Sequence, residues 1–172
     1  PVMSFTADEI WQFMPGERSE SVFLEAWYTH LVPLDAADED RAWWDTVLLV
    51  RSAVSKQFEG MRKDGTIGSS LDAEVTLYCQ SPIKEQLEKL DGELRFALLT
   101  SEARVLDWDQ KPADAVSTEV ESLALLATAS EHGKCPRCWH HREDVGASSE
   151  HPELCGRCVE NVDGAGELRR FV

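Results

Sequence analysis

The sequence predicts an α+β protein that ends in a small metal-binding module. Three features support this prediction: helical periodicity before residue 64, strand-like alternation after residue 65, and four cysteines in two C-x-x-C pairs near the end. Helices therefore come first, and strands mixed with helices follow. We expect three parts, at residues 1–64, 65–130 and 131–172.

A short helix is predicted at the start. Thr6 is a candidate N-cap, Glu9 would complete a capping box, and Phe5 would pack on Ile10 as a hydrophobic staple. A Pro-Gly pair at 15–16 would end this helix after two to three turns. Because so short a helix is not stable by itself, we expect it to pack on something larger and the chain to be part of a longer protein.

The longest periodic segment predicts a helix from about Asp38 to Lys63. Its apolar residues recur every three or four positions and therefore share one helical face. Gly65 is a plausible C-terminal stop. The residues of this apolar face are Trp43, Val47, Val50, Val54, Phe58 and Met61.

Strands are predicted in the middle of the chain. Val75, Leu77 and Cys79 alternate with polar residues, which is typical of a half-buried strand. Val105 and Trp108 indicate a second strand, and residues 123–129 a third. Between them, residues 109–117 read as a linker because they are rich in Pro, Asp and small residues.

A further helix is predicted to open at Ser81-Pro82, with Ile83, Leu87 and Leu90 on its apolar side. The run at 94–99 is apolar on both sides, so its pattern leaves helix and strand equally open. The chain contains no internal repeat and no low-complexity tract.

Two pairs of cysteines, Cys135 with Cys138 and Cys155 with Cys158, are separated by 16 residues. This spacing is typical of a structural zinc site with four thiolate ligands and no open position for water. Pro136 and Gly156 supply turn chemistry within the pairs. A redox dithiol, two disulfides and an iron site are the alternatives. The nearby His140, His141 and His151 are expected outside the metal shell.

Net charge is −15, which argues against a general grip on nucleic acid. The acids are unevenly distributed, because residues 134–172 carry seven acids and six bases, a net charge of only −1. If any part contacts a polyanion, it is this tail. Its bases would either contact RNA or balance the negative charge of a four-thiolate zinc site.

Composition predicts a soluble, intracellular protein. The 42% hydrophobic content is normal for a globular domain, and no apolar run reaches the ~18 residues of a membrane span. Cys79, in an apolar run, is expected to be a buried small hydrophobe.

Three blocks of sequence resemble the C-terminal region of bacterial isoleucyl-tRNA synthetases. They are the opening PVMSFTADEIW, the segment IGSSLDAEV at 67–75, and the terminal KCPRCWHH with CGRCV and ELRRFV. The resemblance implies the end of a helical anticodon-binding domain at 1–64, an α+β continuation at 65–130, and a zinc module at 131–172. It also implies that Cys135, Cys138, Cys155 and Cys158 are the ligands of one structural zinc ion.

The same resemblance implies a cytoplasmic enzyme that charges tRNA with isoleucine using ATP, and implies as partners the anticodon region of tRNA(Ile) and the rest of the synthetase. The catalytic HIGH and KMSKS signatures are absent from these 172 residues. We therefore expect no catalytic residue in this chain and no ATP site. The chain alone should be inactive.

Candidates for tRNA contact lie in the zinc module, including its closing segment at residues 167–172. Trp139 would stack on an unpaired base, or it would pack against the metal knuckles as a miniature core. The basic candidates are Lys134, Arg137, Arg142, Arg157, Arg169 and Arg170.

Two other classes of function are kept as alternatives. Fpg/Nei-type DNA glycosylases carry a similar zinc finger, but the start of this chain lacks the Pro-Glu pair expected of their catalytic N-terminus. A zinc-stabilised protein-interaction module is also compatible with the acidic composition.

Overall fold

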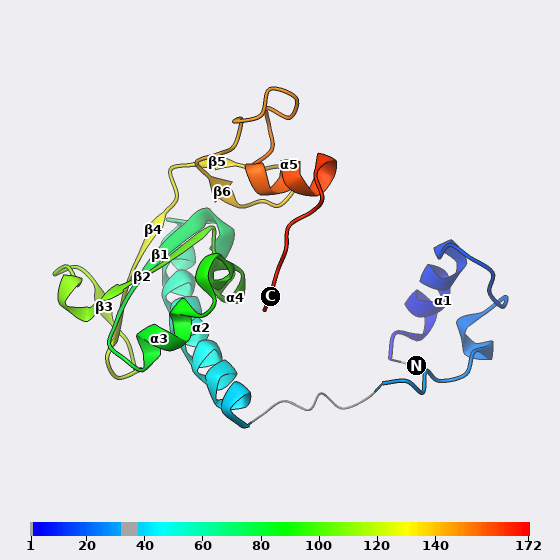
Figure 1. The fold of residues 1–172 in the computed structure, drawn as a ribbon, viewed down its shortest axis with the longest axis horizontal. Helices are drawn as coiled ribbons and strands as arrows, with labels where there is room; N and C mark the ends of the chain where they lie inside the picture. Colours follow the sequence, from blue (N-terminus) through cyan, green and yellow to red (C-terminus); the bar gives the residue numbers. More distant parts are fainter. Residues whose placement is uncertain (1, 32–37) are drawn as a thin grey trace. The chain divides into compact units, whose positions relative to one another are not determined.

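The computed structural model describes residues 2–31 and 38–172. The chain divides into two compact units, Pro1–Ala36 and Ala37–Val172. Each unit is described by itself below, with the helix and strand labels of Figure 1.

The first unit holds helix α1 (Ser4–Phe13) and a 3-10 turn, η1 (Val22–Leu24). The Asp8 carboxylate joins them, because its Oδ1 accepts hydrogen bonds from Ser21 Oγ (2.6 Å) and from the backbone N–H of Val22 (2.9 Å). The predicted capping box is wrong, since the Ala7 N–H already donates to the Met3 carbonyl at 2.7 Å. Thr6 consequently lies inside the helix, where its hydroxyl is not at the capping position.

Large apolar side chains of this unit are exposed, and none of the residues of α1 is buried within the described ranges. Exposed apolar surface of this extent marks a contact site in soluble proteins. That the unit packs on something larger stays a prediction. The most exposed of these side chains are Val2, Phe5, Phe13, Trp27 and Leu31.

The second unit begins with α2 (Asp38–Lys63), the long helix that periodicity predicts. Its apolar stripe faces the core, with Val50 and Val54 fully buried and Met61 at its margin. At its end, Gly65 takes a positive φ of 74°, and the Thr66 N–H donates to the Met61 carbonyl at 2.9 Å. Glycine adopts this conformation without a Cβ penalty, so the predicted stop is confirmed.

A four-stranded sheet in the order β2-β1-β4-β3 forms the centre of this unit. Its central strand β1 runs parallel to β2 and antiparallel to β4, so that Leu77 lies opposite Val105 and Leu125. The strand bounds are β1 (Ala73–Cys79), β2 (Glu102–Asp107), β3 (Val116–Ser117) and β4 (Leu123–Ala129).

Three short helical pieces connect β1 to β2, namely α3 (Ile83–Glu88), η3 (Asp91–Glu93) and α4 (Leu94–Leu98). The apolar side chains of α3 and α4 share one core with α2 and the sheet. Figure 1 shows α2, α3 and α4 beside the sheet. Leu87 and Leu98 lie in that core. Helices and a four-stranded sheet thus pack around one core, which confirms the predicted α+β fold class.

Two sequence predictions fail around the sheet. Trp108 lies in a 3-10 turn, η4 (Trp108–Gln110), because β2 ends at Asp107, whose side chain caps that turn. Residues 109–117 are not a linker, since Val116 and Ser117 pair with β4 in the same sheet. The ambiguous run at 94–99 is the helix α4, which Leu99 ends with a φ of 56°.

The remaining elements belong to the cysteine-rich part: a hairpin of β5 (Gly133–Lys134) with β6 (His141–Arg142), and helix α5 (Gly156–Asp163). Figure 1 shows them beyond the end of β4, with the closing segment running back toward α4. By contacts, all of 37–172 forms one unit. The functional boundaries at 64/65 and 130/131 stay predictions.

The closing segment is tethered rather than loose. The Glu93 carboxylate accepts hydrogen bonds from the backbone N–H groups of Arg170 (2.7 Å), Phe171 (2.7 Å) and Val172 (2.9 Å). The Phe171 ring also lies edge-on to Trp43, with centroids 5.1 Å apart. Burial acts to raise the pKa of Glu93, but these three donors outweigh it and hold the pKa below its ordinary value.

We expect Glu93→Gln to loosen this tether. The neutral amide loses the charge-assisted bonds, so the amides of 170–172 should exchange with solvent roughly tenfold faster. The depressed pKa means that the contribution of Glu93 is present above the ordinary carboxyl pKa of about 4.3 and disappears as pH falls through the lower folded-state value. Hydrogen exchange measured from pH 7 to pH 3 tests this. Glu88→Gln is the control, and equal exchange in both variants would contradict the tether.

Candidate metal centre

The fold brings all four predicted ligands together. The Sγ atoms of Cys135, Cys138, Cys155 and Cys158 lie within 4.8 Å of one another. Cys138 Sγ and Cys155 Sγ are 3.7 Å apart. A tetrahedral zinc site with Zn–S bonds of about 2.3 Å has sulfur–sulfur edges of about 3.8 Å. The cluster therefore fits a structural Zn²⁺.

The first pair is placed by the β5–β6 hairpin. The Cys135 N–H donates to the His140 carbonyl (3.0 Å), and the Trp139 N–H donates back to the Cys135 carbonyl (2.8 Å). This turn requires Trp139 to adopt a φ of 66°, in the left-handed region that non-glycine residues rarely occupy. The tight turn brings Cys138 back toward Cys135.

The second pair is placed by the start of α5. Cys155 is the N-cap of this helix, and the Val159 N–H donates to the Cys155 carbonyl at 3.0 Å. Gly156 is the first helical residue, and its φ is not positive, unlike that of several other described glycines. The prediction that this glycine supplies a turn conformation that other residues resist is therefore wrong. Its role is spatial, because a Cβ at Gly156 would meet Asp144 Oδ2 at 2.8 Å.

The protein environment shifts the pKa values of the cysteine thiols in different directions. Burial acts to raise the pKa of Cys135, but backbone N–H groups directed at its sulfur outweigh burial and lower the pKa to about 6. Burial instead raises the pKa of Cys138 and of Cys155. Four thiolates packed this closely, three of them on buried cysteines, are thus favourable only beside a cation, which is what a divalent metal supplies.

A disulfide does not describe these residues. All five cysteines, each within the described ranges, are free. The 3.7 Å between Cys138 and Cys155 also exceeds the ~2.05 Å of a sulfur–sulfur bond. Cys79 is buried at 1% exposure in β1, away from the cluster.

The histidines lie around the cluster without entering the four-sulfur set. His140 Nδ1 is 3.1 Å from the Cys138 carbonyl. His141 Nε2 is 3.4 Å from Asp72 Oδ1, and His151 contacts Asp163. Each histidine therefore contacts a carbonyl or carboxylate group and is not part of the cysteine cluster.

Several of the predicted tRNA-contact residues are held by partners within the chain. Arg137 Nη1 donates to Cys158 Sγ at 3.5 Å, and Lys134 Nζ lies 3.4 Å from Asp72 Oδ1. Arg142 is paired with Glu102 and donates to the Ser101 carbonyl. Lys134 and Arg142 thus link the module to residues of the sheet side, whereas the partner of Arg137 is a cysteine of the cluster.

The other predicted bases lie in or near the closing segment. Arg157 makes two contacts of 2.7 Å with Glu167, which lower the pKa of Glu167 to about 2, and Arg169 shares that carboxylate at 3.1 Å. Arg170 stays exposed, with its guanidinium 5.0 Å from the Phe171 ring. Trp139 is 63% exposed and lies outside the module's small core of cysteines with Val145 and Leu154.

Sequence reasoning missed the residues that receive the module on the sheet side. Ser101 is fully buried, and its Oγ accepts the His141 N–H at 2.7 Å. Phe96 of α4 lies edge-on to the His140 ring at 5.6 Å. Asp72, Ser101 and Phe96 are 30 or more residues from the cysteines, so no local spacing could have indicated them.

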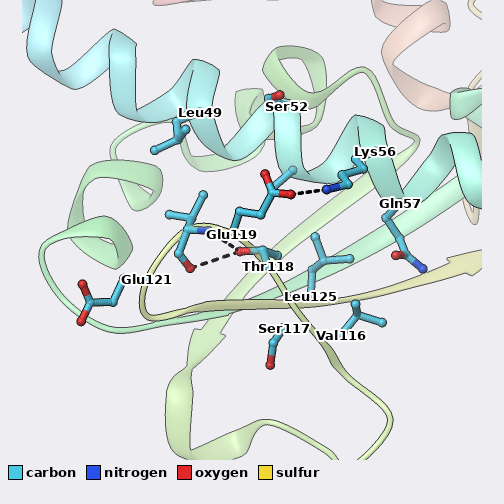
Figure 2. A pocket seen from close by; sticks show the side chains of 12 residues that line it. Leu49, Ser52, Lys56, Gln57, Val116, Ser117, Thr118, Glu119, Glu121 and Leu125 are labelled. Carbon is cyan, nitrogen blue, oxygen red and sulfur yellow. Dashed lines mark hydrogen bonds and ion pairs between the residues drawn. The ribbon is translucent and has the colours of Figure 1, made fainter.

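A groove of about 570 Å³ lies between α2 and the β3–β4 connection. Figure 2 shows Lys56 of α2 reaching toward Glu119, with which it forms an ion pair across the groove. Leu49, Val116 and Leu125 line its apolar side. Both members of the ion pair are largely exposed, and such a pair adds little to stability.

Helices within the described residues include none that is both long and apolar enough to cross a membrane.

Comparison with known proteins gives two findings. A family model described as "Zinc finger found in FPG and IleRS" matches residues 133–161, the segment that contains all four cysteines. Isoleucine–tRNA ligases are similar over 99% of the chain: those of Thioalkalivibrio sulfidiphilus (58% identical, 18% of that protein's length), Alkalilimnicola ehrlichii (54%, 19%) and Pseudomonas entomophila (54%, 18%).

The chain thus spans about a fifth of the length of the curated relatives it matches. The zinc-finger match alone would leave FPG and IleRS open, but the similarity extends well beyond residues 133–161. Over nearly its whole length this chain is therefore similar to one part of isoleucine–tRNA ligases, and within that length it matches the zinc-finger family model.

Proposed function

We propose that this chain is the part of a cytoplasmic isoleucine–tRNA ligase that binds the anticodon region of tRNA(Ile). The complete enzyme would use ATP to charge that tRNA with isoleucine, and the zinc ion would be purely structural. The role of the chain is positioning, since docking of the anticodon loop orients the distant acceptor end for reaction. The single observation that carries this proposal is the exposed Trp139 ring beside the four-cysteine cluster.

Trp139 is suited to stacking for two reasons. It is 63% exposed although it directly follows a metal ligand, and it is held on a tight turn by the hydrogen bond from its N–H to the Cys135 carbonyl. A fixed, exposed aromatic ring is the platform on which unpaired RNA bases stack. Packing as a miniature core is disfavoured, because the small core of the module consists of other residues.

In the full-length ligase, Trp139→Ala should lower kcat/KM for tRNA(Ile) roughly tenfold, which is the size expected for loss of one stacked base. Isoleucine-dependent ATP–pyrophosphate exchange should be unchanged, because activation needs no tRNA. Charging and exchange assays on the same preparation measure both.

Trp139→Phe is the matched control. Both substitutions keep the strained φ of 66°, so they differ in the ring and not in the backbone. Phe should restore most of the charging rate while zinc content stays equal in all three proteins. Loss of zinc in the alanine variant would instead support a packing role.

Two alternatives have direct tests. Strand nicking at abasic DNA would support a glycosylase, and binding of tRNA that ignores the anticodon would favour a protein-interaction module. The isolated chain should show no ATP–pyrophosphate exchange.

A further inference from the structure

The zinc module is attached to the sheet first through its β5–β6 hairpin. The His141 N–H donates to Ser101 Oγ at 2.7 Å, and Arg142 pairs with Glu102, the first residue of β2. The start of β2 lies beside the start of β1, which is paired in turn with the end of β4. This attachment is therefore at the end of the sheet from which the chain enters the module. By itself it would let the module turn about that end.

The closing segment, residues 167–172, makes a second attachment on the side of α5. Glu167 accepts a hydrogen bond from Arg157 Nε of α5 at 2.7 Å. The Cζ atom of Arg169 lies 4.0 Å from the centroid of the Phe96 ring, and that of Arg157 lies 5.0 Å from the same centroid. Helix α5 and the closing segment thus meet α4 at one aromatic ring. Figure 1 shows the closing segment running from α5 back toward α4.

The far end of the closing segment is fastened to the helices. Glu93 accepts the three backbone N–H groups of residues 170–172, and the Phe171 ring packs against the main core beside Trp43 of α2. Glu93 directly precedes α4, whereas Ser101 follows the end of that helix. The two attachments therefore lie at opposite ends of α4, and together they restrain rotation as well as position.

We propose that the closing segment, through Glu93 and Phe171, fixes the orientation of the zinc module and thereby acts as a positioning element for Trp139. The Trp139 ring turns with the module, because its N–H is bonded to the Cys135 carbonyl at 2.8 Å. A binding group is effective only when the residues behind it hold it in place. The role in charging rests on the proposed function, whereas the orientation of the module does not.

Residual dipolar couplings of the zinc-loaded 172-residue chain measure that orientation. In the original chain, the amides of 133–161 and those of the sheet should fit one alignment tensor. Phe171→Ala removes the ring from the core, so the couplings of 133–161 should shrink and no longer fit the tensor of the sheet. Leu168→Ala is the matched control, because Leu168 belongs to the same segment but is 99% exposed. It should keep the common fit.

Glu93→Ala is the second variant. It removes the acceptor of all three closing hydrogen bonds without removing a core side chain, so the test stays decisive even if loss of the Phe171 ring disturbs the core. The same loss of the common fit is expected, with zinc content unchanged. A common fit that persists in both variants would overturn the proposal.

Charging by the full-length ligase tests the positioning role. Phe171→Ala should lower kcat/KM for tRNA(Ile) by no more than the roughly tenfold expected of Trp139→Ala, since it acts through that residue. Phe171→Leu, which keeps an apolar side chain, should restore most of the rate, and isoleucine-dependent ATP–pyrophosphate exchange should be unchanged throughout. Adding Phe171→Ala to Trp139→Ala should cause no further loss, because both changes affect one contact.

The outcomes separate this proposal from the proposed function. Losses that multiply in the double variant would show that the closing segment does not act through Trp139, and would refute the positioning role. Unchanged charging in Trp139→Ala alone would instead contradict the proposed function, whatever the couplings show.

Discussion

Replacement of Cys158 by serine is expected to abolish zinc binding and to unfold the module. Cys158 is fully buried, and its sulfur lies among those of the other three cysteines. A water molecule could not take the place of this sulfur without bringing solvent to the cluster. Structural zinc contributes about 10–16 kcal/mol of apparent binding free energy in small zinc-dependent folds, which exceeds what so small a core supplies. Metal analysis should fall from about one zinc ion per chain to none.

Nuclear magnetic resonance should show where the damage stops. Amide signals of 133–161 should lose their dispersion, while those of the sheet, which has its own apolar core, should persist, with shifts near Asp72 and Ser101, which contact the module. Cys79→Ala is the control: it removes a buried thiol outside the cluster and should keep full zinc content. A Cys158→Ser chain that retains tight zinc would show that the four-sulfur assignment is wrong.

The second large effect is expected from Leu77→Ala, which should destabilise the second unit by about 2–5 kcal/mol. Leu77 is fully buried on the central strand β1, between Val105 of β2 and Leu125 of β4. Its truncation leaves a cavity that flanking strands cannot close, and total stabilities are only about 5–15 kcal/mol. Urea unfolding followed by far-UV circular dichroism measures the loss.

Leu48→Ala is the control, because it removes the same atoms as Leu77→Ala but from an exposed side chain. Leu48 lies on α2 with 53% exposure, so its loss should cost no more than about 0.5 kcal/mol. Similar midpoints for the two variants would contradict the placement of the core. The zinc content of both should remain complete, because neither residue contacts the module's cluster.

Sequence alone was sufficient where the relevant neighbours are close along the chain. The four ligands follow from C-x-x-C spacing, because a local turn brings each pair of sulfurs together. Helix α2 follows from its apolar stripe, and β1 and β4 from their patterns. The run at 94–99 stayed ambiguous for a physical reason: Leu94, Ala97 and Leu98 are all buried, so apolar residues crowd the short run without a clear period.

Sequence by itself thus determined the α+β class, the long helix, the four cysteines that cluster and the family resemblance. Only the tertiary structure decided that Trp139 is exposed and that most of the module's arginines already have partners. The physical reason is distance along the chain. Burial and ion pairing depend on residues such as Phe96 and Glu93, which reach the module or the closing segment only after the sheet and α4 have formed.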